Sequence, residues 1–261
     1  MYKWNAEDYQ KSSSTQQKWA KELIKKLDLK GNECILDIGC GDGKVTAKIA
    51  SILNKGHVLG IDSSEDMIKL AQKTFPKKNY ENLSFKVKDV CSLDFNEQFD
   101  ILFSNAALHW IRDHLDILKR SKTSLKPSGK ILFQMGGKGN AEDILEIADE
   151  MIITEPWKEY FRNFNFKYGF YGKEEYEKWL EEAGLKTMRV EIIPKVMTKN
   201  GKEDLKSWIR TTWLPYIERV PDKLKDQFMD ELASKYIQKY PEDNKGKIHV
   251  KMVRLEVEAT K

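Results

Sequence analysis

The sequence lacks any apolar run of the roughly 18 residues that a membrane-spanning helix needs. Its first residues, Met1–Lys11, also lack the apolar stretch of a secretion signal. Both absences predict a cytoplasmic protein with no membrane partner.

Cysteine is scarce, with three residues in 261. Cys34, Cys40 and Cys91 show no C-x-x-C spacing, so the sequence predicts no disulfide and no bound zinc or other metal. We interpret the three thiols as small core residues.

A strong excess of charge of one sign is missing as well. The 45 Lys and Arg residues are interleaved along the chain with 41 Asp and Glu residues, which leaves a net charge of +4. This pattern argues against a nucleic-acid partner. The 40% of hydrophobic residues suffices for a packed interior, and the length fits one core with an added subdomain. We expect a monomer or a weak homodimer.

Short apolar runs alternate with helical patterns through the first half of the chain. The expected strands are 34–38, 58–61, 83–87, 100–103 and 130–135, and the expected helices are 14–29, 44–53, 64–75 and 113–125. Such alternation builds right-handed βαβ units, hence a parallel sheet covered on both faces. The sequence therefore predicts an α/β fold with a Rossmann-like, doubly wound sheet.

Two later strands, at 188–193 and 248–257, would complete a mostly parallel sheet of seven strands. We expect a helical cap inserted after strand five and between the last two strands. The expected ranges are 1–135, 183–199 and 247–261 for the core and 136–182 and 200–246 for the cap. Ligands of open α/β sheets bind at the carboxyl ends of the strands.

A glycine loop follows the first strand in the segment ILDIGCGDGK. Gly39, Gly41 and Gly43 would let the backbone approach a ligand. A dinucleotide fingerprint needs another glycine where this chain has Lys44, which disfavours pyrophosphate. Asp37 would repel phosphate but suits the ammonium of an amino-acid group.

The next two strands also end in acids. Asp62 has the spacing expected for a carboxylate that accepts hydrogen bonds from ribose hydroxyls. Asp89 could accept from an adenine amine, and Val90 could supply a backbone N–H. Each acid alone could be a helix cap or a turn residue, but three in register with the glycine loop predict a nucleoside site.

These motifs resemble those of the class I S-adenosylmethionine-dependent methyltransferases. The matching segments are LDIGCGDG at 36–43, GID at 60–62, Asp89, FDILFSNAALHW at 99–110 and LKPSGKI at 125–131. Ser128 replaces a glycine that is usual in this family. The resemblance implies S-adenosylmethionine as cofactor, with candidate binding residues Asp37, Gly39, Cys40, Gly41, Asp62, Ser63, Met67, Asp89, Val90 and Asn105.

A narrower resemblance links SNAALHW, the N-terminal W-N-x-x-x-Y and the segment 208–221 to the subgroup of trans-aconitate and juvenile hormone acid methyltransferases. This similarity implies a small carboxylic acid as the methyl acceptor. Such a carboxylate is ionised at neutral pH and needs no general base, whereas an alcohol or amine would.

Two catalytic candidates follow the fourth strand, Asn105 and His109. His109 is the best candidate base, although it could equally orient the loop or pack beside Trp110. Arg210 is the first candidate for holding an acceptor carboxylate, because arginine offers a bidentate fork. The rival residues are Arg219, Arg254 and His249.

Other acceptor-site candidates are aromatic or lie near the N-terminus. Trp4 and Tyr9 could form a lid over the cofactor, and Gln17 and Trp110 could contact the acceptor. The aromatic stretch 157–179 could line an apolar acceptor pocket or form the core of the cap.

Several functions remain open on the sequence. The acceptor could be an amine, hydroxyl or carbon centre of another small metabolite, or the chain could be a non-catalytic nucleoside-binding module. An NAD-dependent oxidoreductase would share the sheet but lacks its third glycine. A nucleic-acid methyltransferase would need a strand end for a flipped base that is not found here.

Overall fold

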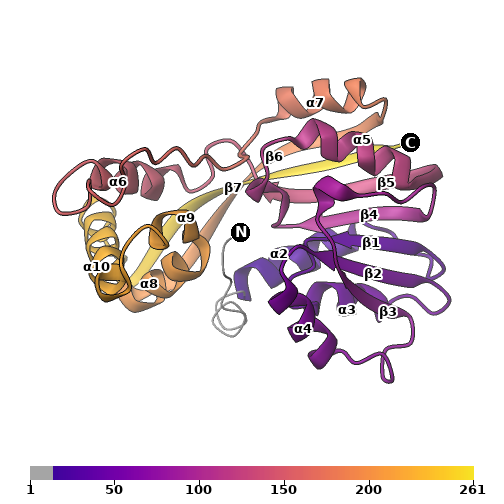
Figure 1. Cartoon of the computed structure of the whole chain (residues 1–261), viewed down its shortest axis with the longest axis horizontal. Helices are drawn as coiled ribbons and strands as arrows, with labels where there is room; N and C mark the ends of the chain where they lie inside the picture. The colour runs from indigo at the N-terminus through magenta and orange to yellow at the C-terminus, as the bar shows by residue number, and fades with distance from the viewer. Residues whose placement is uncertain (1–13) are drawn as a thin grey trace. The chain divides into compact units, whose positions relative to one another are not determined.

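The computed structural model describes residues 14–261, with side chains from Trp19 onward. It contains a seven-stranded sheet with the order β3-β2-β1-β4-β5-β7-β6 (Figure 1). The strands are β1 (Cys34–Ile38), β2 (His57–Asp62), β3 (Leu83–Val87), β4 (Phe99–Asn105), β5 (Leu125–Gly136), β6 (Lys186–Asn200) and β7 (Lys247–Thr260). Strands β1 to β5 pair in parallel, and β7 runs antiparallel to β5. The predicted Rossmann-like sheet is confirmed.

The helices of the described residues follow the expected pattern closely. They are α2 (Ser14–Lys25), α3 (Lys44–Ala50), α4 (Glu65–Thr74), α5 (His114–Ser124), α6 (Glu142–Ile152), α7 (Lys173–Glu182), α8 (Gly201–Thr212), α9 (Leu214–Ile217) and α10 (Asp222–Lys239), with short 3-10 turns η1 (Val90–Ser92) and η2 (Leu108–Trp110). Side-chain caps fix two of the starts: Ser64 accepts from the N–H of Met67, and Asp113 from the N–H of Asp116.

The chain divides into two compact units, and both consist of separate stretches of sequence. The sheet unit comprises 14–138, 168–193 and 254–261, and the helical unit comprises 139–167 and 194–253 within the described residues. Strands β6 and β7 each contribute residues to both units. Helix α7 belongs to the sheet unit, although the sequence grouped it with the cap.

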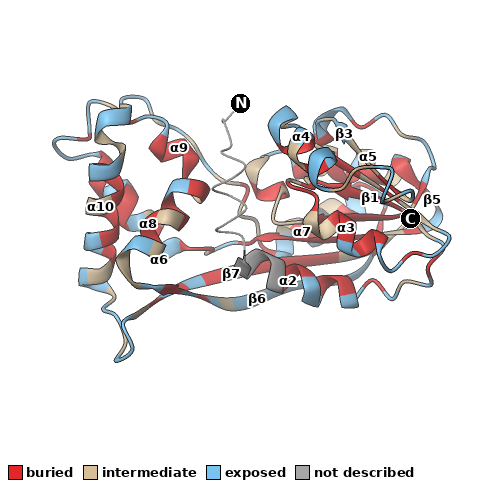
Figure 2. Ribbon diagram, turned by 90° about the horizontal axis from the view of Figure 1, so that it is seen from below, coloured by how far each residue is buried: buried red, intermediate tan, exposed pale blue. Residues whose placement is uncertain are grey.

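Two hydrophobic clusters cover opposite faces of the sheet, as alternating side chains of each strand require. On one face, Leu23 of α2 and Ile49 of α3 pack with Phe103 of β4. On the other face, Leu118 of α5 and Leu180 of α7 pack with strand residues. The central strands β1, β4 and β5 are mostly buried (Figure 2).

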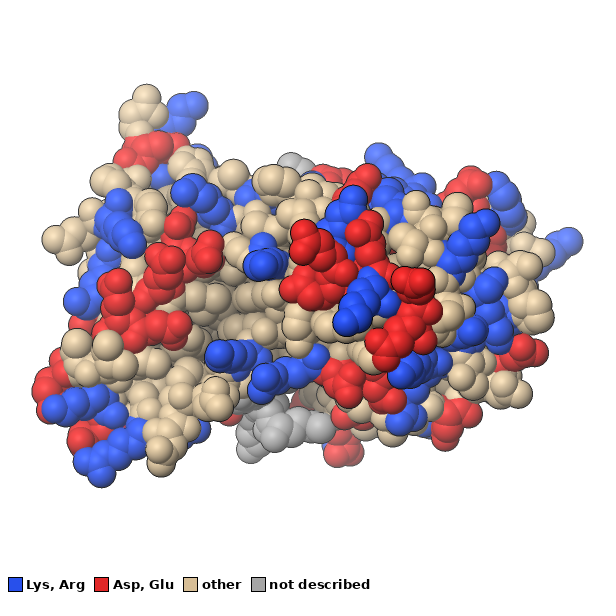
Figure 3. All heavy atoms as spheres, turned by 90° about the horizontal axis from the view of Figure 1, so that it is seen from above, with Lys and Arg blue, Asp and Glu red and all other residues tan. Residues whose placement is uncertain are grey.

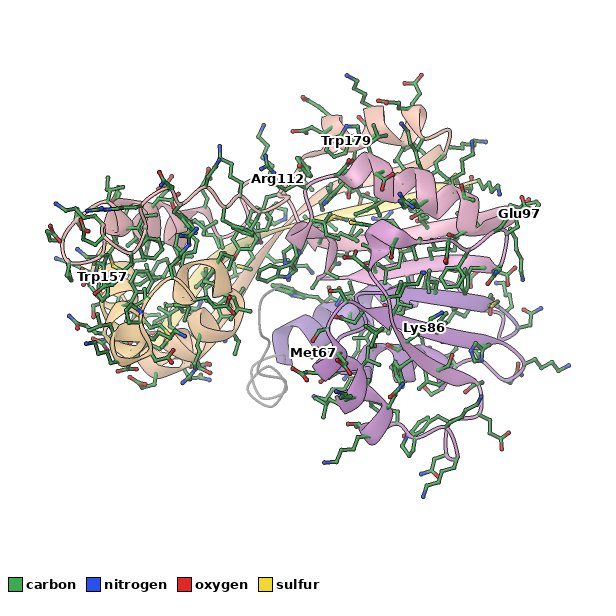
Figure 4. All side chains as sticks on the ribbon, in the orientation of Figure 1. Met67, Lys86, Glu97, Arg112, Trp157 and Trp179 are labelled. Carbon is green, nitrogen blue, oxygen red and sulfur yellow. The ribbon has the colours of Figure 1, made fainter. Side chains whose placement is uncertain are left out.

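The helical unit has an aromatic core of its own. Trp157 is fully buried, and its ring lies 5.0 Å from that of Phe228 on α10 in an edge-on arrangement. Phe161 stacks on Phe228 at 5.7 Å, and the indole N–H of Trp157 donates to Glu231 at 2.8 Å. Figure 4 labels Trp157 here and Trp179 in the sheet unit. The aromatic stretch of the sequence is therefore shared between two cores.

The described residues test the expectations about membrane spans, metal sites and cysteines. No helix of the described residues is long and apolar enough to cross a membrane. Among the same residues, no cluster of three or more His, Cys, Asp or Glu side chains is arranged to hold a metal ion. Cys40 is buried, but Cys91 is exposed and is not the core residue that we expected. On the face drawn in Figure 3, basic and acidic side chains lie beside one another.

Candidate functional site

The loop between β1 and α3 contains three glycines with positive φ. Gly39, Gly41 and Gly43 have φ values of 73°, 52° and 79°, a region that strains residues with side chains. A Cβ at Gly39 would lie 2.1 Å from the Cβ of Ala107, whereas a Cβ at Gly41 would meet no atom within 4 Å. The loop therefore touches the segment after β4 at Gly39 and presents its backbone to open space at Gly41.

Two backbone hydrogen bonds anchor this loop to the neighbouring strand. The N–H groups of Gly39 and Cys40 donate to the carbonyl of Ile61 at 2.8 and 2.9 Å. Burial and nearby carboxylates raise the pKa of the Cys40 thiol. Cys40 is therefore a neutral packing group in the loop.

Asp62 ends β2 beside the glycine loop. Its Oδ2 accepts from the N–H of Gly41 at 3.0 Å, and its Oδ1 accepts from the N–H of Ser64 at 2.8 Å. Burial raises the pKa of the Asp62 carboxyl, and the two N–H donors oppose that effect. Because each carboxylate oxygen can accept more than one hydrogen bond, the partly exposed Asp62 can still accept from two ribose hydroxyls.

Asp37 is the most deeply buried of the three predicted acids, at 2% exposure. Its Oδ2 accepts from the hydroxyl of Thr46 in α3 at 2.7 Å. Burial raises the pKa of Asp37 to about 7, although the Thr46 hydrogen bond lowers it and the charge of Asp62 raises it further. A positively charged group placed beside Asp37 would restore the ionised carboxylate.

The remaining candidates for the expected cofactor site follow the carboxyl ends of β2 and β3. Asp89 is exposed and caps η1, with its Oδ1 accepting from the N–H of Cys91 at 2.9 Å. Val90 is buried at the start of η1, and Ser63 is exposed. Met67 is buried on α4 (Figure 4). Asp89 is therefore a helix cap, which is one of the alternatives that the sequence left open. Its second carboxylate oxygen takes no part in this cap.

Asn105 is the last residue of β4, and His109 follows it in η2. Asn105 is partly exposed, and His109 is buried in η2 with its Nδ1 3.4 Å from the backbone N of Gly136. Burial lowers the pKa of His109 to about 3, and the charges of Arg254 and His114 add to this effect. The imidazole is therefore neutral at physiological pH and is a weak base.

Three partly exposed aromatic side chains gather around His109. The ring centroid of His109 lies 5.8 Å from that of Trp110, 5.7 Å from Phe170 and 6.5 Å from Tyr168. The N–H of Gly169 donates to the carbonyl of His109 at 2.8 Å. The segment 168–170 therefore packs directly on η2 within the sheet unit.

The cationic candidates are distributed over both units. Arg210 is exposed on α8 of the helical unit, between the buried Trp208 and Trp213. Arg219 is exposed in the same unit, with its guanidinium carbon 5.6 Å from the ring centre of Phe164. A hollow of about 490 Å³ beside Arg219 is lined in part by Phe164.

The other two rivals differ in burial. Arg254 of β7 is 4% exposed, and its guanidinium lies 4.4 Å from the ring centre of Trp19 in α2. His249 is exposed and pairs with Asp243 at 2.9 Å. Of these two, Arg254 shares the sheet unit with the residues around the glycine loop.

Three predicted residues near the N-terminus receive no structural test. Trp4 and Tyr9 lie outside the described residues. Gln17 lies in α2, but its side chain is also outside the description.

Sequence reasoning missed some of the contacts at this edge of the sheet. Thr46 lies nine residues after its partner Asp37, in a helix that the sequence predicted without assigning this residue a role. Tyr168 and Phe170 flank Gly169, and this alternation of aromatic residues about a glycine was the signal available. Their contact with Trp110 forms because the chain comes back from the helical unit into the sheet unit at residue 168. No local sequence pattern predicts that course of the chain.

The methyltransferase domain family matches residues 29–184 of the chain. An uncharacterised methyltransferase of Schizosaccharomyces pombe is 32% identical over 213 residues, which cover 80% of this chain and 79% of the relative. Trans-aconitate 2-methyltransferase of Rhizobium etli is 25% identical over 261 residues, with 99% of each chain covered.

A similar fold occurs among solved structures. Phosphoethanolamine N-methyltransferase 2 of Haemonchus contortus, in complex with S-adenosyl-L-methionine, has a TM-score of 0.60 and 23% sequence identity to this chain. The match covers 98% of this chain and 56% of that chain.

Proposed function

The chain belongs to the methyltransferase domain family, and on that basis we propose that it transfers the methyl group of S-adenosylmethionine to the carboxylate of a small molecule. S-adenosylmethionine is its cofactor, in keeping with the family and with solved methyltransferase structures of this fold. When bound, the cofactor supplies an electrophilic methyl carbon. The chain's own residues would orient the acceptor toward that carbon and exclude water from it.

The residues at the carboxyl ends of β1 to β3 fit this cofactor. The open backbone at Gly41 leaves room for a ligand beside the loop. Asp62 would accept from the ribose hydroxyls, and Asp37 would face the ammonium of the methionine moiety. Asp89 and Val90 would hold the adenine through one acceptor and one donor.

The carboxylate acceptor is supported by the burial of His109. A general base works best with a pKa near the operating pH, whereas the pKa of His109 is lowered to about 3. An acceptor that needs no deprotonation suits such a site, and a carboxylate is already ionised. His109 and Asn105 would then position the acceptor without taking a proton.

This chain is similar to a trans-aconitate 2-methyltransferase along its whole length, which also supports a carboxylate as the methyl acceptor. We propose Arg210 as the group that holds it, because its fork can donate two hydrogen bonds to a carboxylate. Arg219, exposed in the same unit, is the matched control. Arg210→Ala should raise the acceptor KM at least tenfold with little change in kcat, and Arg219→Ala should not.

The test is a transfer assay with methyl-labelled S-adenosylmethionine and matched acceptors that share one ring: benzoate, benzylamine and benzyl alcohol. We expect label in the benzoate ester and a kcat that is flat between pH 6 and 8. Transfer to the amine or alcohol alone, with kcat rising along a titration, would contradict the carboxylate proposal. His109→Gln should keep kcat within about tenfold, whereas loss of a true base costs about 100-fold or more.

A further inference from the structure

The segment 168–171 returns from the helical unit and is held against the end of the sheet at several backbone positions. The N–H of Gly169 donates to His109, and the N–H of Lys138 donates to Tyr171 at 2.9 Å. Gly137 and Tyr171 also form an isolated parallel bridge. The backbone that carries Tyr168 and Phe170 is therefore fixed relative to η2.

Gly169 shows how close this packing is. A Cβ at Gly169 would lie 2.1 Å from the carbonyl oxygen of Ile111. Tyr168 and Phe170, on either side of Gly169, bring their rings together on one side of the segment. Their rings stack at 4.9 Å with an interplanar angle of 10°.

Trp110 extends this stack from the other chain segment. Its ring centroid lies 5.2 Å from that of Tyr168 in an edge-on arrangement. All three rings are partly exposed, in contrast to the fully buried Tyr176 in the core of the same unit. Large aromatic surfaces that stay partly accessible can contact a bound ligand.

The 3-10 turn that carries Trp110 begins directly after the residue that the glycine loop contacts. Ala107, which Gly39 touches, is three residues before Trp110 in the same turn of chain. The rings and the imidazole of His109 are neutral, so they offer planar apolar surface and no counter-ion for a carboxylate. The body of an acceptor can contact them while its charged end is bound elsewhere.

We infer that Trp110, Tyr168 and Phe170, here named the aromatic wall, form the side of the acceptor site that selects a flat, unsaturated carbon skeleton. This inference rests on the proposed methyl transfer to a small carboxylic acid. Residues of the sheet unit then determine the specificity for the acceptor, because a planar acceptor stacks on the rings and a puckered one loses contact area.

The experiment compares benzoate with cyclohexanecarboxylate, which carry the same head group on a flat and a puckered six-carbon ring. Their dissociation constants are measured by calorimetry in the presence of S-adenosylhomocysteine, so the readout does not depend on turnover. We expect the wild-type protein to bind benzoate at least fivefold more tightly. Phe170→Leu and Tyr168→Leu should each bring this ratio toward one, because each removes a stacking surface.

Tyr80→Leu is the control, because Tyr80 packs edge-on against Phe75 just before β3, at the amino ends of the strands. It should leave the ratio unchanged, and S-adenosylhomocysteine affinity should stay constant in all three variants. An unchanged ratio in both Phe170→Leu and Tyr168→Leu would overturn the aromatic wall. If the ratio responds as expected but no acid is methylated, the wall stands and the proposed reaction fails.

Discussion

The neighbouring carboxylates of Asp37 and Asp62 accept different sets of hydrogen bonds, so the protein stabilises their negative charges to different degrees. Asp62 receives two backbone N–H groups, whereas Asp37 has one hydroxyl partner in a more buried position. Burial therefore dominates at Asp37, and its pKa is raised to about 7. The two residues should respond differently to pH and to substitution.

Asp37 should make cofactor binding depend on pH. Below pH 7 its carboxyl is increasingly protonated, and the ammonium of the cofactor must displace that proton, so affinity should fall by up to tenfold per pH unit. Calorimetric titration of S-adenosylmethionine between pH 5.5 and 7.5 checks this. 5′-Methylthioadenosine, which has no amino-acid group, is the control ligand. Equal pH slopes for both ligands would refute the assigned role of Asp37.

Asp62→Ala should weaken S-adenosylmethionine binding by about 1.5 to 3 kcal/mol, the scale of hydrogen bonds to a charged group. Asp62→Asn should be milder, because an amide oxygen keeps one acceptor in place. Asp66→Ala, an exposed acid in the first turn of α4, is the matched control. Calorimetry that gave wild-type affinity for Asp62→Ala would exclude the ribose contact.

The glycine loop and the turn after β4 meet at one pair of positions, which a double substitution can test. Gly39→Ala should destabilise the fold by about 2 kcal/mol or more, because its Cβ would overlap that of Ala107. Adding Ala107→Gly should restore part of this loss and leave the strain of a positive φ. Urea unfolding of the wild type, both single variants and the double variant measures the coupling. Strictly additive effects would show that the two positions do not interact.

Most strands and helices of the sheet unit could be predicted from the sequence, because each buries a regular pattern of apolar residues. The predicted strand 34–38 matches β1 and 83–87 matches β3. The strand expected at 130–135 proved longer, since β5 begins at Leu125 and pairs through an irregular register with β4. Ser128, within it, adopts a φ of 64° where the family usually has glycine.

The aromatic stretch 157–179 could not be divided correctly from the sequence. Trp157 and Tyr176 are both buried aromatic residues, but one packs on α10 and the other donates its hydroxyl to Met135 Sδ in the sheet unit. Aromatic composition carries no period that distinguishes these cores. The candidate site was likewise only partly predictable. The acids at the strand ends could be recognised in the sequence, whereas the contact of residues 168–170 with Trp110 depends on the tertiary fold.

The stability of the folded chain should fall in acid because of its buried histidines. His114 is 1% exposed, its Nδ1 lies 2.5 Å from the hydroxyl of Tyr176, and burial lowers its pKa to about 4. The unfolded histidine takes up a proton near pH 6.5, which the folded one resists. Its contribution is therefore complete above pH 6.5 and falls by about 1.4 kcal/mol per pH unit down to pH 4.

Denaturation of the wild type and His114→Gln at pH 7.5, 6, 5 and 4.5 measures this effect. The comparison cancels the opposite contribution of Asp37, whose raised pKa favours the folded state at lower pH. The free-energy difference between the two proteins should shrink as the pH falls. A constant difference would show that His114 titrates alike in both states.

The discontinuous make-up of the helical unit determines how this fold can be recombined with that of a relative. Hydrogen bonds join its two stretches: Tyr240 donates to Asp143 at 2.9 Å, and Trp157 of the first stretch donates to Glu231 of the second. A chimera that exchanges only 139–167 or only 194–253 would break these pairs and leave donors without acceptors. The helical unit can therefore be transplanted between relatives only as a matched pair of inserts, through four splice points.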